Sequence, residues 1–167
     1  MITIKLFKPN FYFKKVTDID SQFLKELKIK TILLDVDNTL TPPDSNVLFD
    51  GVKDFLENLK NQNFKIIIVS NNDEKRVASF AKIVGLPYVF HAHKPLPFKI
   101  KKYLKGKTEN TMVVGDQILT DILLANLASF KSVLVEPQSE DPDRLSFKAK
   151  RSFEKYLMRK ENKKWEK

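Results

Sequence analysis

Residues 31–41 read Thr-Ile-Leu-Leu-Asp-Val-Asp-Asn-Thr-Leu-Thr. A short apolar run is followed here by two aspartates, Asp35 and Asp37, with one residue between them. A short apolar run of this kind is typical of a β-strand that is covered on both faces. The apolar residues of 52–61 recur with the period of a helix, and 65–70 is a second apolar run. Strand, helix and strand in this order predict a parallel sheet with helices on both faces.

The same alternation continues to the end of the chain. Gly and Pro fall between the periodic segments, where they end helices and form turns. The first strand is predicted to cover 31–36. Further strands are predicted at 88–90, 111–114 and 132–135, and further helices at 74–84, 98–104, 118–127 and 141–164. We therefore expect one α/β domain over 1–167 with a Rossmann-like core at 31–136. Residues 1–30 are expected to form a basic, aromatic arm and helix, and 141–165 a basic C-terminal helix.

Composition narrows the class of protein. The 167 residues suffice for one domain with its own core, and 42% hydrophobic with 31% charged residues is too apolar for a disordered chain. The absence of Cys excludes disulfide frameworks, thiolate zinc sites and cysteine nucleophiles. No apolar run is long enough to span a bilayer, and Lys5, Lys8 and Pro9 interrupt the first ten residues. We therefore expect a cytoplasmic protein without a secretory signal.

The net charge of +9 is concentrated at the two ends of the chain. Residues 1–31 carry +4 and 144–167 carry +7, whereas 32–143 carry −2. Basic ends predict an anionic partner such as a lipid surface, a nucleic acid or an acidic protein; a solvated arm and helix is the alternative. The C-terminal helix is predicted to be basic and amphipathic, a form typical of peripheral contact with an anionic membrane. Four aromatic residues of the arm are candidates for the membrane interface: Phe7, Phe11, Tyr12 and Phe13. As an alternative to membrane contact, the apolar face of the C-terminal helix could pack on the sheet and leave its charges in water.

Polar residues follow the predicted strands at their carboxyl ends, which meet at one edge of a parallel sheet. They comprise carboxylates, a hydroxyl, amides and an ammonium: Asp35, Asp37, Asn38, Ser70, Asn71, Lys94, Asp116 and Asp121. Carboxylates that converge repel one another unless a cation is bound, and an oxygen-only ligand set suits Mg²⁺. A hydroxyl, a lysine and backbone N–H groups opposite the metal form a cage for a tetrahedral anion. One carboxylate can then attack phosphorus while another transfers the proton.

The order of these residues resembles that of the haloacid dehalogenase (HAD) superfamily of phosphohydrolases. The resemblance rests on Asp35-x-Asp37-Asn38-Thr39, Ser70, Lys94-Pro95 and Gly115-Asp116-x-x-x-x-Asp121. It implies that Asp35 is the nucleophile and a Mg²⁺ ligand. It also implies that Asp37 is the general acid and base, with its backbone carbonyl on the metal.

The same resemblance assigns roles to the remaining residues. Ser70 would hydrogen-bond the transferring phosphoryl group, and Lys94 would neutralise its charge and steady Asp35. Asp116 would ligate Mg²⁺ directly, and Asp121 would hold the water shell of the metal or Lys94. Backbone N–H groups near Asn38 and Asn71 would complete the phosphate-binding cage.

Two intervals of the sequence limit the substrate. Asp35 and Ser70 are 35 residues apart, and Ser70 and Lys94 are 24 apart, so neither interval has room for a cap domain. We therefore expect an open site, as in capless members of the superfamily that act on large substrates.

The chain most resembles the subclass IIIA branch that includes the phosphatidylglycerophosphate phosphatases. The resemblance rests on residues 6–15, residues 115–121 and Asn126. It implies hydrolysis of phosphatidylglycerophosphate to phosphatidylglycerol. Together with the basic ends of the chain, this activity leads us to expect a cytoplasmic enzyme that contacts the inner membrane face peripherally.

Other functions stay open at this stage. Basic and aromatic ends also suit a phosphatase that acts on nucleic-acid ends or on another bulky or soluble phosphate ester. A receiver-type signalling domain is less favoured, since its acidic pair is adjacent, and a non-catalytic scaffold would not need every catalytic side chain. His91 and His93 could share a face as a metal pair, although loop residues near the substrate entrance are the expected role.

Overall fold

The structure, a computed structural model, describes residues 5–140, 148–150, 152–154 and 156. The strands are β1 (Phe11–Phe13), β2 (Thr31–Leu34), β3 (Lys65–Val69), β4 (Tyr88–Val89), β5 (Thr111–Gly115) and β6 (Lys131–Val135). The helices are α2 (Ser21–Glu26), α3 (Val52–Asn61), α4 (Glu74–Val84), α5 (Phe98–Tyr103) and α6 (Leu123–Ala128). A 3₁₀ turn, η1 (Val16–Asp18), and a π-helical turn, η2 (Ile118–Ile122), complete the elements with assigned bounds.

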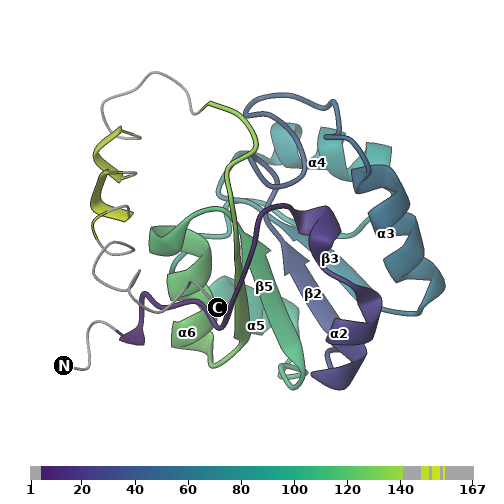
Figure 1. The fold of residues 1–167 in the computed structure, drawn as a ribbon, viewed down its shortest axis with the longest axis horizontal. Coiled ribbons are helices and arrows are strands. Elements are labelled where there is room, and N and C mark those ends of the chain that lie inside the picture. Colours follow the sequence, from purple (N-terminus) through teal and green to yellow (C-terminus); the bar gives the residue numbers. More distant parts are fainter. Residues whose placement is uncertain (1–4, 141–147, 151, 155, 157–167) are drawn as a thin grey trace.

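The six strands form one sheet in the order β1-β6-β5-β2-β3-β4, and every neighbouring pair is parallel. Figure 1 shows β2 beside β5 in the middle of this sheet. From β2 the chain moves outward to β3 and β4, and it then returns to β5 on the other side of β2. The direction of winding therefore reverses between β2 and β5. In open α/β sheets a ligand binds beyond the carboxyl ends of the strands at such a point.

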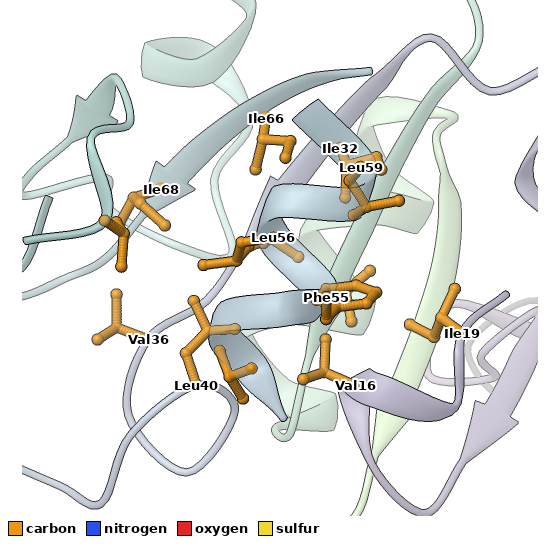
Figure 2. Close-up of a cluster of buried hydrophobic side chains, with 14 of the residues drawn as sticks. Val16, Ile19, Ile32, Val36, Leu40, Phe55, Leu56, Leu59, Ile66 and Ile68 are labelled. Carbon is orange, nitrogen blue, oxygen red and sulfur yellow. The ribbon is translucent and has the colours of Figure 1, made fainter. Parts of the chain in front are cut away.

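Alternate residues of the central strands face two separate apolar cores. Ile32 and Leu34 of β2 pack in the core beneath α3 and α4, whereas Leu33 packs in the core beneath α5 and α6. Figure 2 shows Phe55, Leu56 and Leu59 of α3 among the first set of side chains. This confirms the prediction of a parallel sheet covered on both faces, because burial on both faces is what makes these strands uniformly apolar.

Most predicted elements are confirmed, with small differences at their ends. The ranges of α3 and α4 are as predicted; the Asp73 carboxylate caps α4 by accepting from Arg76 N–H at 3.0 Å. Strand β2 ends at Leu34 rather than at residue 36. It ends there because the Val36 carbonyl accepts hydrogen bonds from the N–H groups of residues 39–41 and so closes a turn.

The N-terminal arm is a strand of the sheet and not a free aromatic segment. Phe11 and Phe13 pack edge-on against Phe23 of α2, with ring centroids 4.9 and 5.4 Å apart, and Phe7 packs against a third apolar cluster. These three half-buried phenylalanines therefore pack against the rest of the fold, and contact of the arm with a membrane stays a prediction. Tyr12 is exposed, and its hydroxyl donates to Glu136.

The segment predicted as one helix over 118–127 has two parts, η2 and α6. Residues 148–150, 152–154 and 156 are helical, and the rest of the predicted C-terminal helix lies outside the described residues. The Glu154 carboxylate in this segment accepts from Leu119 N–H of η2 at 3.2 Å. Across the part of the chain that the structure describes, no helix has both the length and the apolar character needed to cross a bilayer.

Candidate active site

Three polar residues lie directly beyond the ends of neighbouring strands. Asp35 follows β2, Ser70 follows β3, and Asp116 follows β5. Leu34 of β2 is in register with Ile68 of β3 and with Val114 of β5. Because the three strands are parallel, these residues emerge at one edge of the sheet, where the winding reverses.

Lys94 is buried among carboxylates at this edge. Its Nζ lies 2.5 Å from Asp35 Oδ1 and 2.7 Å from Asp121 Oδ1, and its side chain is only 4% exposed. Burial alone would lower the pKa of Lys94, but the carboxylates of Asp121 and Asp35 raise it above its ordinary value. Lys94 is therefore a fixed positive charge beside Asp35.

Three carboxylates converge at this edge of the sheet. Asp35, Asp116 and Asp121 each offer a ligand oxygen, and these oxygens all lie within 4.8 Å of one another. Burial raises the pKa of Asp35 to about 6; the nearby Lys94 lowers it and Asp121 raises it further. A desolvated cluster of carboxylate oxygens fits a hard divalent cation.

Asp37 is held apart from this cluster by other partners. Its Oδ1 accepts from Arg76 Nη2 at 2.9 Å, and its Oδ2 accepts from Asn72 Nδ2 at 2.6 Å. Burial and the neighbouring Asp35 raise the pKa of Asp37, although Arg76 and Asn72 oppose them. A raised pKa brings this carboxyl closer to the range in which it can both give and take a proton.

The turn after β5 brings Asp121 back against the strand. A Cβ built at residue 115 would lie 2.3 Å from Asp121 Cγ, so the close approach requires glycine at this position. Asp121 Oδ2 accepts from Gln117 N–H at 3.2 Å across the π-helical turn. The Gly-Asp-x-x-x-x-Asp pattern thus has a steric reason: Gly115 makes room for the carboxylate that meets Lys94.

Residues after β3 position Lys94 from the other side. The Asn71 amide donates to the Lys94 carbonyl at 3.0 Å and accepts from Lys94 N–H at 2.7 Å. Ser70 is 3% exposed, and its Oγ accepts from Asn72 N–H at 3.1 Å. The Asn71 side chain therefore fixes the backbone from which the Lys94 ammonium reaches Asp35.

Comparison with known proteins agrees with this site. The sequence model of the family described as "Mitochondrial PGP phosphatase" matches residues 1–138. The chain belongs to this PGP phosphatase family. It is 35% identical over 136 residues to "Probable phosphatase YqeG" of Bacillus subtilis, covering 80% of this chain and 79% of that protein.

A plant relative and three solved structures extend the comparison. "Phosphatidylglycerophosphate phosphatase 1, chloroplastic/mitochondrial" of Arabidopsis thaliana is 28% identical over 148 residues, which are 80% of this chain and 42% of that protein. A hydrolase from Streptococcus pneumoniae has a TM-score of 0.54 at 17% identity, covering 63% of this chain and 91% of that one. The cobalt-bound deoxy-D-mannose-octulosonate 8-phosphate phosphatase from Haemophilus influenzae has a TM-score of 0.51 at 15% identity, covering 81% of this chain and 90% of that one. This PGP phosphatase family member is therefore a phosphatase. Its structural likeness to a "putative HAD family hydrolase" from Streptomyces avermitilis, with a TM-score of 0.52 at 18% identity, shows that it has the HAD fold.

The site of this PGP phosphatase family member contains most of the predicted residues, with one difference. Asp121 contacts Lys94, as the resemblance implied, and its carboxylate also lies within the cluster of candidate metal ligands. Asn38 is used inside its own loop: its N–H donates to the Thr41 carbonyl, and its Oδ1 accepts from Ser139 N–H at 3.1 Å. The N–H of Asn38 is thus not available to phosphate, contrary to the prediction.

Arg76 and Thr39 contact the predicted catalytic residues, and the sequence analysis gave neither a role. Thr39 Oγ1 donates to Asp35 Oδ2 at 3.2 Å, and Arg76 holds Asp37 while also donating to the Ser45 carbonyl at 2.6 Å. The sequence does contain a feature that could have singled out Arg76: it is the one arginine before residue 144 in a lysine-rich chain. Arginine suits a rigid, multiply bonded contact with a carboxylate better than lysine does.

His91 and His93 are exposed, with ring centroids 6.4 Å apart and the rings nearly parallel. Neither belongs to the group of three or more metal-ligating side chains found among the described residues. Both lie in the loop that leads to Lys94, as predicted, and a position near the substrate entrance stays a prediction.

Proposed function

We propose that the chain hydrolyses a phosphate monoester through an aspartyl phosphate formed on Asp35. The observation that carries this proposal is the environment of the Asp35 carboxylate. It is desolvated, held by Lys94 at one oxygen and by Thr39 at the other, and placed where the winding of the sheet reverses. Such a carboxylate is oriented and poorly hydrated, as a nucleophile toward phosphorus needs to be.

The reaction balances with two carboxylates. An oxygen of Asp35 forms a bond to phosphorus as the bond from phosphorus to the ester oxygen breaks, and the Asp37 carboxyl gives its proton to that leaving oxygen. Water then attacks the phosphorus of the aspartyl phosphate. Asp37, now ionised, accepts the proton of the water, and Asp35 is released together with inorganic phosphate.

Other residues would bind and neutralise the phosphoryl group. Lys94 supplies positive charge next to the attacking oxygen, and Ser70 with the backbone N–H of Asn71 is proposed to donate hydrogen bonds to phosphoryl oxygens. Asp35, Asp116 and Asp121, with the Asp37 backbone carbonyl, are proposed to hold Mg²⁺. When bound, Mg²⁺ would offset the negative charge that these carboxylates and the phosphate share.

We further propose that the phosphate is that of a lipid head group, phosphatidylglycerophosphate. The family match and the name of the Arabidopsis relative support this substrate. The described chain between Asp35 and Ser70 consists of a loop, α3 and β3, and α4 and β4 lie between Ser70 and Lys94. Such short connections leave the phosphate site open to a head group that projects from a membrane. Cytoplasmic location and membrane contact through the basic C-terminal helix remain predictions.

Phosphate release from three classes of substrate tests the proposal. Phosphatidylglycerophosphate, a 3′-phosphorylated oligonucleotide and a panel of sugar phosphates would be compared at equal concentration with Mg²⁺ or with EDTA. We expect the lipid to be the preferred substrate, EDTA to abolish turnover, and Asp35→Asn to abolish it while the fold persists. Full activity in EDTA would remove the metal from the proposal. Wild-type turnover by Asp35→Asn would refute the assignment of Asp35 as the nucleophile. Preference for the oligonucleotide would show that the substrate is a nucleic-acid end and not a lipid.

A further inference from the structure

The segment from Phe90 to Thr108 is a strongly basic stretch within the otherwise acidic middle of the chain. It contains six lysines and no aspartate or glutamate, although residues 32–143 as a whole carry −2. Lys94 is buried and paired with Asp35 and Asp121, so the outward positive charge of the segment comes from the exposed lysines of α5 and of the turn after it, Lys101, Lys102, Lys105 and Lys107. Charge segregated in this way creates a local field that attracts an anionic partner.

Apolar side chains are exposed among these lysines. Phe98 is 75% exposed, Leu96 51% and Tyr103 41%, while Ile100 and Leu104 of the same segment are fully buried in the core beneath α5 and α6. Lys101 and Lys102 are exposed on α5. The segment therefore anchors one side in the protein and presents the other, basic and apolar, to its surroundings. Single exposed apolar residues are ordinary, but three within eight residues among lysines form a patch.

This surface is joined rigidly to the catalytic edge. Leu96 lies two residues after Lys94, whose Nζ contacts Asp35, and Leu96 N–H donates to the His93 carbonyl at 2.8 Å. Lys99 of α5 donates to the carbonyls of Phe90 and His91 at 2.5 and 3.1 Å, which ties the loop to the helix. Whatever binds Leu96 and Phe98 is thereby positioned next to the phosphate-binding site.

We propose that this α5 surface, formed by Leu96, Phe98, Lys101, Lys102 and Tyr103, docks the enzyme on an anionic phospholipid surface. Lysines near an anionic leaflet are attracted to it, and exposed Leu, Phe and Tyr side chains enter the interfacial region. Leu96 favours a membrane over a nucleic acid, because an aliphatic side chain offers no face on which a base can stack. The inference deepens the proposed function and rests on it: a docked α5 surface would bring the open site to head groups.

Vesicle binding tests this surface without depending on catalysis. The full chain would be sedimented with vesicles of phosphatidylglycerol and phosphatidylcholine, and with vesicles of phosphatidylcholine alone. We expect binding to the anionic vesicles only, and a loss of about tenfold or more in affinity for Lys101→Glu/Lys102→Glu. We also expect a clear loss for Leu96→Ala/Phe98→Ala. Thermal unfolding of each variant would establish that it is folded.

Matched controls come from the opposite face of the sheet. Lys53→Glu/Lys82→Glu makes the same change in net charge on α3 and α4, and Ile83→Ala removes an apolar side chain that is 56% exposed. These controls are expected to bind vesicles like the wild type. Equal losses in the two pairs of lysine variants would overturn the proposal, because the effect would then follow net charge and not the α5 surface.

Two further results also decide the matter. Absence of wild-type binding to anionic vesicles would overturn the α5 surface even if phosphatidylglycerophosphate in detergent were hydrolysed, so the proposed function would survive. Binding that depends on α5 without lipid hydrolysis would refute the substrate and support the surface. Loss of binding to a single-stranded oligonucleotide in Lys101→Glu/Lys102→Glu, with vesicle binding intact, would assign the surface to nucleic acid instead.

Discussion

Replacement of Asp35 by Asn is predicted to stabilise the metal-free protein while it abolishes catalysis. Asp35 and Asp121 both contact the Lys94 ammonium in a buried site, and a carboxylate oxygen of Asp116 lies close to theirs. The folded state therefore holds Asp35 with a pKa of about 6 instead of the model-peptide value of 3.8. A difference of about two pKa units lowers the free energy of unfolding of the wild type by roughly 3 kcal/mol at neutral pH. We expect Asp35→Asn to raise the free energy of unfolding by about 1–3 kcal/mol, because Lys94 loses one partner in the variant.

The dependence on pH follows from the direction of this shift. Between about pH 4 and pH 6 the folded protein keeps a proton on Asp35 that the unfolded chain has lost, so the stability contributed by this group falls as pH rises through that range. Asparagine has nearly the same shape and does not ionise. The variant should thus be more stable than the wild type at pH 7.5, and the difference should shrink toward zero near pH 4.

Urea unfolding in EDTA at the two pH values measures this difference. Asp50→Asn, an exposed aspartate in the turn before α3, is the control and should change the free energy of unfolding by no more than about 0.5 kcal/mol. A variant at Asp35 that is no more stable than the wild type at pH 7.5 would refute the reasoning. So would an advantage that is equally large at pH 4.

Three other perturbations test separate parts of the site. Mg²⁺ at ten times its dissociation constant should raise the free energy of unfolding of the wild type by about 1.4 kcal/mol, seen as a higher unfolding midpoint, and Asp116→Asn should largely lose this response. Gly115→Ala should cost about 1–3 kcal/mol in urea unfolding and weaken Mg²⁺ binding, because the new Cβ would displace Asp121; unchanged values for both would contradict the steric argument. Arg76→Met should lower kcat at least about tenfold for an alkyl phosphate but much less for an aryl phosphate, whose leaving oxygen needs no proton from Asp37, whereas exposed Lys75→Met should affect neither. Equal losses on the two substrates would show that Arg76 does not position the proton donor.

Local pattern was sufficient for most of the fold. The central strands are apolar because both of their faces are covered. Helix α3 begins after Gly51, and α4 begins after the capping Asp73 and ends before Gly85, residue types that mark helix ends in many proteins. Strand β1 was missed because three residues carry little periodic signal. The strand is stabilised by its pairing with β6 and by the packing of Phe11 against Phe23, which the local sequence does not reveal. The π-helical turn was missed for a similar reason, since the contact of Asp121 with Lys94 and Gly115 depends on distant parts of the chain.

The sequence by itself determined which chemical groups lie at the carboxyl edge of the sheet, because the ends of apolar strands follow from short-range pattern. The family resemblance already implied that Lys94 contacts Asp35 and Asp121, and the structure contains both contacts. Only the tertiary structure decided that Arg76 holds Asp37 and that the side chain of Asn38 is used inside its own loop. Hydrogen bonds form between residues separated by up to 124 positions, and the choice of partners depends on distances of a few ångströms that no local pattern encodes.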